Sequence, residues 1–166
     1  MKAYEREDGL YEAEAHLLDT KPFAFERLLA PDPLPAGAPL HDLSLRIVLD
    51  AQLVVRAIEA AADATPFSVC SEATLTLSPL IGLRLASGWS RVVKETLQGP
   101  AGCTHLAELL LPLATTALQG IWGLRRSTDE QGANERRQRI DSCYAFAANR
   151  DVVRIAWPDR YKGPIE

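Results

Sequence analysis

The stretch LHDLSLRIVL (residues 40–49) alternates apolar and polar side chains over most of its length. Apolar residues at positions 43, 45, 47 and 49 fall on one face, and residues 42, 44, 46 and 50 fall on the other. This period of two predicts a β-strand with one buried face. His41 shares the parity of the buried leucines, so we expect its imidazole at the edge of the core.

Two neighbouring segments extend this strand into a sheet. Residues 10–18 also alternate, with Tyr11, Ala13, Ala15 and Leu17 on one face and Glu12, Glu14 and His16 on the other. The segment 53–62 is ambiguous, because its valines and Ile58 suit a strand that returns through a turn at 50–52, whereas its alanines also suit a helix. We favour the strand, which gives a small antiparallel sheet of about three strands.

Three helices are expected to follow the sheet. Ser78 and Pro79 are typical of a helix N-cap and first position, and apolar residues follow at helical spacing until Gly99. A second helix is predicted from Cys103 to about Gln119, apolar on nearly all sides, as a central helix would be. The pattern predicts an α+β fold in a single domain spanning residues 1–166.

The C-terminal part has the weakest pattern. A third helix is predicted after Asn134, with Ile140, Cys143 and Tyr144 on one face. Residues 152–158 look extended and are expected to form an edge strand.

Composition and charge exclude several classes of protein. The 166 residues are 47% hydrophobic and 24% charged, and the net charge of −4 gives no basic footprint for DNA or RNA. The charged N-terminus is unlike a signal peptide, and no apolar run reaches the roughly 20 residues of a membrane helix. We therefore expect a cytoplasmic protein whose partner is a protein or small molecule, not nucleic acid or a membrane. Its three cysteines are then free thiols or ligands rather than a disulfide framework.

Reactive side chains concentrate in GCTHLAEL (residues 102–109), at the start of the long apolar helix. Gly99, Pro100 and Gly102 interrupt the chain, so Cys103 and His105 fall at the helix N-terminus. Unpaired backbone N–H groups and the positive end of the helix dipole stabilise a thiolate there, and the thiolate is the form that attacks electrophiles or binds metal.

Three interpretations of this stretch stay open. In the first, Cys103 and His105 hold zinc or iron, with the ligand set completed by His41, Cys70 or Cys143. In the second, Cys103 is a nucleophile and His105 or His41 is its base, in thiol-dependent acyl transfer or hydrolysis. In the third, Cys103 is a small buried residue and His105 a capping or core histidine of a non-catalytic interaction module.

Several other residues have a structural alternative to a functional role. Cys70 lies between an extended segment and a helix, where a cleft residue and a core cysteine are equally expected. Cys143 is expected to be buried on its helix. His16, with Asp19 and Lys21, is expected on a solvated polar face.

Five segments carry a resemblance: HLLDTK (16–21), LHD (40–42), PFSVC (66–70), GCTHL (102–106) and DSCY (141–144). Together they resemble a bacterial family known only as a domain of unknown function (DUF2889-like). The resemblance spans almost the whole chain and implies no activity.

Residues 10–120 are also similar to the NifU-type (SufE-NifU) iron–sulfur scaffold fold. Cys70 and Cys103 resemble its second and third ligand positions, whereas Leu40-His41-Asp42 stands where that family has Cys-Gly-Asp, so one thiolate is missing. The likeness implies a metal- or sulfur-handling accessory protein. Zinc, iron or an iron–sulfur scaffold would then be held by Cys103, His105, Cys70 and His41.

Overall fold

The structure, a computed structural model, describes residues 1–124 and 138–163 and divides into two compact units, Met1–Leu124 and Arg125–Glu166. The first unit holds β1 (Lys2–Glu5), β2 (Tyr11–Thr20), β3 (Pro39–Leu49), β4 (Val55–Ala64), η1 (Ser68–Leu80), α1 (Trp89–Leu97), η2 (Gly99–Ala101) and α2 (Thr104–Leu124), where η marks a 3₁₀-helix. The second unit holds α4 (Asp151–Ala156) and η3 (Pro158–Arg160). A single domain over the whole chain stays a prediction.

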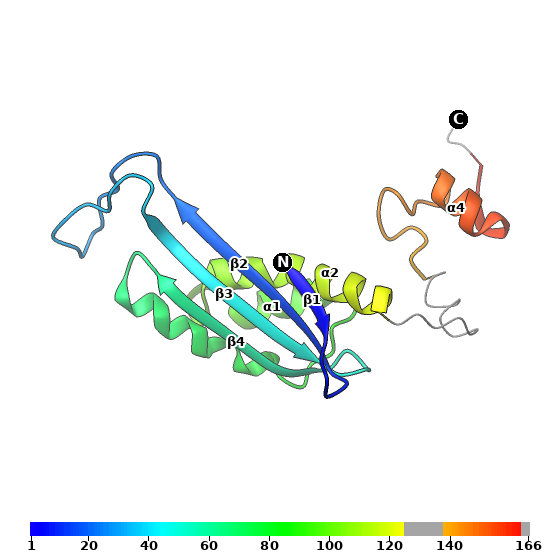
Figure 1. Cartoon of the computed structure of the whole chain (residues 1–166), viewed down its shortest axis with the longest axis horizontal. Coiled ribbons are helices and arrows are strands. Elements are labelled where there is room, and N and C mark those ends of the chain that lie inside the picture. The colour runs from blue at the N-terminus through cyan, green and yellow to red at the C-terminus, as the bar shows by residue number, and fades with distance from the viewer. Residues whose placement is uncertain (125–137, 164–166) are drawn as a thin grey trace. The chain divides into compact units, whose positions relative to one another are not determined.

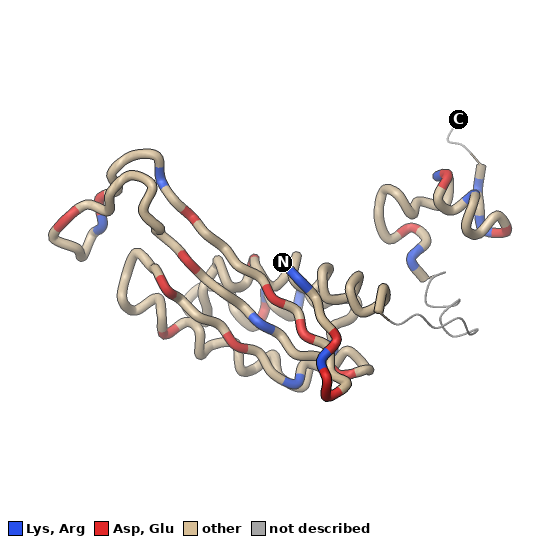
Figure 2. Tube along the Cα trace, in the orientation of Figure 1, with Lys and Arg blue, Asp and Glu red and all other residues tan. Residues whose placement is uncertain are grey.

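The strands form one antiparallel sheet in the order β1-β2-β3-β4, four strands within the described residues (Figure 1). Charged residues recur along the strands (Figure 2), and the predicted alternation of β2 and β3 is confirmed, since Ala13, Leu45 and Ile47 are buried while His16 is exposed. The favoured strand at 53–62 is β4. The α+β class is therefore confirmed, and the strand count is four rather than three.

The additional strand, β1, pairs with β2 and closely approaches α2, and it has no apolar pattern of its own. Its sequence, KAYE, has two charged ends and a single small residue, Ala3, facing the helix. A Cβ built on Gly120 of α2 would overlap the Cβ of Ala3. The missing side chain of Gly120 lets strand and helix meet, which a reading of local alternation does not detect.

A buried carboxylate shapes the turn between β3 and β4. Asp50 accepts hydrogen bonds from the backbone N–H groups of Gln52 (2.8 Å) and Val54 (2.9 Å) and from Nε of Arg56 (2.8 Å). These bonds, the one from Val54 first, hold the pKa of Asp50 below its usual value despite burial. Leu53, with φ of 65°, supplies the left-handed residue of the turn.

Helices lie against one face of the sheet (Figure 1), with α2 on β1 and β2, η1 on β4, and α1 against both α2 and η1. The predicted central helix is confirmed, although it begins at Thr104 and extends to Leu124. Its buried residues are Leu106, Leu109, Leu110, Leu113, Ala114, Ala117 and Ile121. Fully burying one leucine contributes about 1.5–3 kcal/mol, so α2 supplies a large part of the core.

The helix predicted between Ser78 and Gly99 is confirmed in its second half, which is α1 (Trp89–Leu97), but its predicted start at Ser78 is wrong. Residues 68–80 form η1, and the chain then runs alongside the start of β4, where the N–H of Gly82 donates to the carbonyl of Val55 at 2.8 Å. Gly82 also has φ of 85°, which a right-handed helix excludes. Pairing with the strand thus overrides the local helix-start signal.

In the second unit, residues 138–150 form turns instead of the predicted helix, whose start at 134–137 lies outside the described residues. Asp141 has φ of 64°, and its carboxylate accepts the N–H of Ala148 at 2.8 Å, a local bond that competes with helix formation. Cys143, which we expected to be buried, is exposed, and so is the neighbouring Tyr144.

The predicted edge strand at 152–158 is also wrong, since most of it belongs to α4. Arg154 donates to the carboxylate of Asp151 at 2.9 Å, a pairing of residues three apart that favours a helical turn. Val153 is the buried residue of this helix, and a single buried position is no evidence for a strand.

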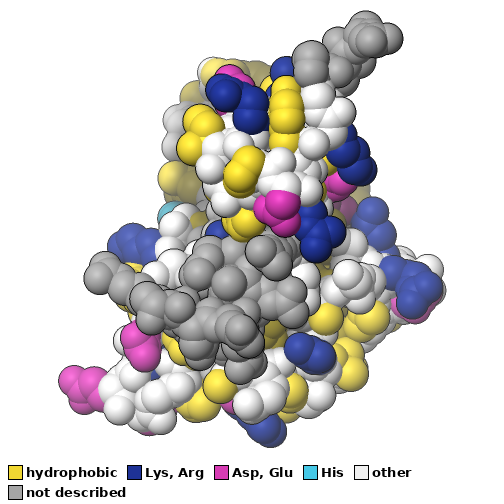
Figure 3. All heavy atoms as spheres, turned by 90° about the vertical axis from the view of Figure 1, so that its right-hand side faces the viewer, with side chains coloured by type: hydrophobic (Ala, Val, Ile, Leu, Met, Phe, Trp, Pro, Cys, Tyr) yellow, Lys and Arg dark blue, Asp and Glu magenta, His cyan; other side chains and the backbone are white. Residues whose placement is uncertain are grey.

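Basic, acidic and apolar side chains lie interspersed on the face drawn in Figure 3.

Candidate thiol–imidazole site

Cys103 occupies the position just before the first residue of α2. Its carbonyl oxygen accepts the N–H of Ala107 at 2.9 Å, the first hydrogen bond of the helical ladder. The preceding residue, Gly102, has no room for a side chain, since a Cβ at this position would lie 2.9 Å from the Cβ of Leu97. The first N–H groups of a helix have no partner within it, so the thiol stands beside a partial positive charge.

The thiol of Cys103 lies beside the imidazole of His105. Sγ and Nδ1 are 3.9 Å apart, at the long end of the range for a hydrogen bond to sulfur. Both side chains are half-buried. A neutral imidazole that accepts a proton at Nδ1 carries its own hydrogen on Nε2. The contact therefore fits a thiol and its proton acceptor.

A second imidazole, that of His41 on β3, faces Asp19 on β2. The two residues are direct partners in the strand register, and Nδ1 of His41 is 3.1 Å from Oδ2 of Asp19. The other carboxylate oxygen accepts from Nζ of Lys21 at 2.9 Å. These contacts, Lys21 first and His41 second, hold the pKa of Asp19 below its usual value. An ionised carboxylate only accepts, so Nδ1 of His41 carries a hydrogen.

The two imidazoles lie against each other, with ring centroids 3.9 Å apart and ring planes tilted by 37°. Burial, followed by the neighbouring His41, lowers the pKa of His105 from the usual value of 6.5, and Asp19 opposes this shift. Protonating His105 would add charge to a half-buried site next to another imidazole. His105 is therefore neutral at pH 7 and able to accept a proton.

All four predicted site residues, Cys103, His105, Cys70 and His41, line one cavity of about 230 Å³. β3 supplies His41, η1 supplies Cys70, and the start of α2 supplies the other two. The remaining lining residues are Leu43, Ala62, Thr65, Pro66, Phe67, Thr104 and Leu106. The cavity is smaller than the roughly 300–1,000 Å³ of pockets for drug-sized ligands, so it suits a small ligand.

The side chains around this cavity do not converge as metal ligands. Within residues 1–124 and 138–163, no three His, Cys, Asp or Glu side chains are grouped so that they could hold one metal ion. Nδ1 of His41 is also engaged by Asp19. Zinc or iron at Cys103, His105, Cys70 and His41 therefore stays a prediction.

Asp19, the partner of His41, is the residue whose place in the site the sequence left open, because it was grouped with His16 on a solvated polar face. The signal was its parity: counted along β2, Asp19 belongs with the buried Ala13 and Ala15 rather than with His16. The same parity in β3 places His41 inward, as predicted. Combining the two strands would have paired Asp19 with His41.

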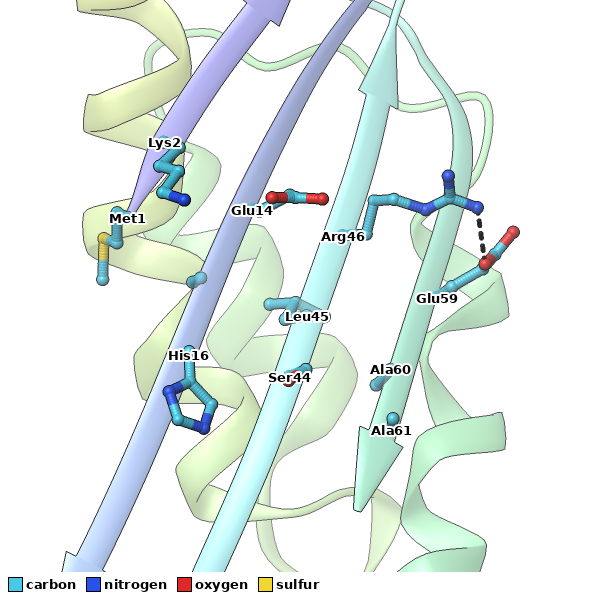
Figure 4. A pocket seen from close by; sticks show the side chains of 11 residues that line it. Met1, Lys2, Glu14, His16, Ser44, Leu45, Arg46, Glu59, Ala60 and Ala61 are labelled. Carbon is cyan, nitrogen blue, oxygen red and sulfur yellow. Dashed lines mark hydrogen bonds and ion pairs between the residues drawn. The ribbon is translucent and has the colours of Figure 1, made fainter. Parts of the chain in front are cut away.

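His16 lies on the opposite face of the sheet and is exposed, as expected. Its Nε2 is 2.6 Å from Oδ1 of Asp42. A groove of about 390 Å³ runs over this face, with His16, Ser44 and the paired Arg46 and Glu59 among its lining residues (Figure 4). None of the described residues that line the groove is a cysteine. It lacks a nucleophilic thiol, so the smaller cavity is the better candidate site.

The described part of the chain is thus an α+β protein in which two thiols and two imidazoles border a small, largely apolar cavity. Residues 1–119 match the family described as protein of unknown function (DUF2889), and the chain belongs to this family. The matched residues include Asp19 and all four predicted cavity residues, whereas Cys143 lies outside them. No curated protein and no solved structure matches the chain.

The family resemblance is therefore confirmed, although DSCY (141–144) lies beyond the matched residues. The likeness to the NifU-type scaffold receives no support from these comparisons. Among residues 1–124 and 138–163, no helix is both long and apolar enough to cross a membrane.

Proposed function

We propose that this protein carries out thiol-dependent acyl transfer or hydrolysis, with Cys103 as nucleophile and His105 as general base. The observation that carries the proposal is the contact of 3.9 Å between Cys103 Sγ and His105 Nδ1, at a helix N-terminus and on the wall of a cavity. A thiol with an adjacent proton acceptor is the usual arrangement of an activated sulfur nucleophile.

The proton acceptor suits the task because of its surroundings. The pKa of His105 is lowered by burial and by His41, so the imidazole is neutral and free to accept the thiol proton near pH 7. His41 is covered by His105 and oriented by Asp19, which makes Asp19 a positioning residue. The unpaired N–H groups at the start of α2 are donors for the oxyanion that develops when the thiol adds to a carbonyl.

Alkylation of the three cysteines at pH 7 tests the proposal. Cys143 is exposed, whereas Cys70 and Cys103 are half-buried. Access alone therefore predicts that Cys143 reacts first, whereas activation by His105 predicts that Cys103 does. We expect peptide mapping after treatment with iodoacetamide to show modification of Cys103 about tenfold or more ahead of the other two. Reaction in the order of exposure would overturn the proposal.

The matched controls for this experiment are Cys70→Ser and His105→Gln. Cys70→Ser removes the second thiol of the same cavity and is expected to leave the rate at Cys103 unchanged. His105→Gln removes the base while keeping a polar side chain of similar length, and is expected to slow the reaction at Cys103 alone.

Metal or sulfur handling is the second candidate function. It is favoured by the presence of two thiols and two imidazoles around one cavity, since these are ligand types that zinc and iron accept. Elemental analysis of untagged protein purified without chelators tests it. Zinc or iron near one per chain, lost in Cys103→Ser, would favour this candidate over the acyl-transfer proposal.

A further inference from the structure

Apart from its thiols and imidazoles, the cavity beside Cys103 is mostly hydrocarbon. Leu43, Ala62, Pro66, Phe67 and Leu106 form this part of the lining. Among the described residues that line the cavity, none is Asp, Glu, Lys or Arg. A carboxylate or phosphate buried there would lack a paired charge, whereas an alkyl chain gains by leaving water.

The volume of the cavity limits the length of that chain. At about 30 Å³ for each water-sized group, 230 Å³ has room for roughly eight non-hydrogen atoms. A chain of about four to eight carbons fills the cavity without forcing its walls apart. Carbons beyond this length would extend out of the cavity and gain no further burial in it.

We infer that the substrate of the Cys103 site is a short, uncharged acyl group of about four to eight carbons, delivered as an ester or a thioester. The inference rests on the proposed function, because it requires Cys103 to form the acyl–enzyme. The apolar lining holds the alkyl chain, and the thiol and His105 lie on the same cavity wall to meet the carbonyl carbon.

The reaction proceeds in two balanced steps. The thiol of Cys103 gives its proton to His105 Nδ1 as sulfur bonds to the carbonyl carbon. The bond from that carbon to the alcohol or thiol of the substrate then breaks, and the leaving group takes the proton from His105. Water or an acceptor alcohol or thiol next attacks the thioester and yields its proton to His105. The carbon–sulfur bond breaks, and the proton returns to the sulfur of Cys103.

Two adjacent alanines of β4 provide a matched pair of variants. Ala62 lines the cavity beside Cys103, whereas Ala61 lines the groove on the opposite face of the sheet. Ala62→Leu fills part of the cavity, and Ala61→Leu adds the same side chain where the cavity is not affected. Phe67→Ala, in the segment that connects β4 with η1, enlarges the cavity and serves if Ala62→Leu does not fold.

The experiment measures acylation of Cys103 by p-nitrophenyl esters with acyl chains of two to twelve carbons, from the nitrophenolate burst and the mass of the intact protein. Each buried methylene is expected to raise the rate about fourfold, up to an optimum of about four to eight carbons. We expect Ala62→Leu to move the optimum to shorter chains, Phe67→Ala to longer chains, and Ala61→Leu to leave it in place. An ester of equal length that ends in a carboxylate is expected to react more slowly.

The outcomes separate this inference from the proposed function. Acylation of Cys103 at a rate independent of chain length, or an optimum that Ala61→Leu shifts as much as Ala62→Leu, overturns the substrate class and leaves the nucleophile in place. Preferred acylation by the carboxylate-ended ester does the same. If Cys103 forms no acyl–enzyme with any ester and alkylates no faster than Cys143, the proposed function fails and this inference fails with it.

Discussion

β2 and β3 each contribute one histidine and one aspartate to two separate pairs, and the two pairs differ in their surroundings. Asp19 and His41 are direct partners in the register and face the core, whereas His16 reaches diagonally to Asp42 on the other face. The inner His41 side chain is 12% exposed and the outer His16 is 57% exposed. The inner pair lies against a second imidazole next to a thiol, and the outer pair borders an open groove of ion pairs.

The comparison shows that a histidine–aspartate pair does not by itself define a site. Opposite pairs on a sheet face are common stabilising contacts, each contributing roughly 0.2–1 kcal/mol. What distinguishes the inner pair is its position at the end of the buried face, where the start of α2 brings Cys103 and His105 to it. The following four predictions test this difference, from the largest expected effect to the smallest.

Truncating a side chain on the inner face of the sheet should destabilise the fold far more than truncating one on the outer face. Leu106 lines the cavity and is buried, whereas Leu18 lies on the outer side of β2 and is exposed. We expect Leu106→Ala to lower the free energy of unfolding by about 2–5 kcal/mol, and Leu18→Ala to change it by about 0.5 kcal/mol or less. Denaturant unfolding of both variants measures the difference, and equal losses would contradict the assignment of the two faces.

Of the two histidines outside the inner pair, His105 and His16, only His105 should affect the reaction of the Cys103 thiol. We expect His105→Gln to slow acylation of Cys103 by about 100-fold or more, the usual contribution of a general base, because the proton acceptor is lost. His16→Gln, on the outer face, should leave the rate unchanged. Burst kinetics with a butyryl ester make the measurement. A fall of similar size in both variants would point to a general effect on the fold.

The inner pair should also set the pH range of the reaction. His41 contributes to lowering the pKa of His105, so His105 stays neutral and active below its usual value of 6.5. In His41→Gln the pKa of His105 should rise, and the acid side of the rate profile should move to higher pH. The profile of His16→Gln should match that of the parent. An acid limb that stays in place in His41→Gln would show that His41 does not influence His105.

The smallest effect is expected from Asp19→Asn. The pKa of Asp19 is lowered in the folded state below the unfolded value of 3.8, so its ionised form stabilises the fold above that pH. This stabilisation is lost as pH falls through the folded pKa. Asp19→Asn should therefore melt slightly below the parent at pH 7 and converge with it under acid.

The matched variant for Asp19→Asn is Asp42→Asn, read out by alkylation at pH 7. Loss of Asp42 on the outer face should leave the rate at Cys103 unchanged, whereas Asp19→Asn should reduce it by releasing His41. If Asp19→Asn left the alkylation rate at Cys103 unaltered, its carboxylate would be a structural partner of Lys21 and nothing more.

The successful predictions came from the spacing of apolar residues along the chain and from the odd or even position of each residue within a strand. The alternation of β2 and β3 gave the core face and the inward position of His41, and the apolar run after Cys103 gave α2. These features depend on burial, which sequence records directly as hydrophobic pattern. The four predicted site residues line one cavity because each stands at an element end, and those ends meet at one side of the first unit.

The errors arose where tertiary contacts override local signals. β1 pairs with β2 and approaches α2 at Gly120, and nothing within KAYE indicates either contact. The start signal at Ser78 and Pro79 was outweighed by pairing of Gly82 with β4. Asp141 turns the chain through its left-handed backbone and its bond to Ala148, where only a periodic stretch was visible in the sequence.

The strand order carries a consequence for folding. Because each strand pairs with its neighbour in the chain, the sheet assembles from hairpins without a crossover, and β3 and β4 are two long strands joined by a short turn around Asp50. Closing a short loop costs less entropy than closing the long segment between β2 and β3, so we expect this hairpin to nucleate the sheet. Asp50→Ala should then slow refolding more than it speeds unfolding in stopped-flow experiments. The opposite partition would place the nucleus outside this hairpin.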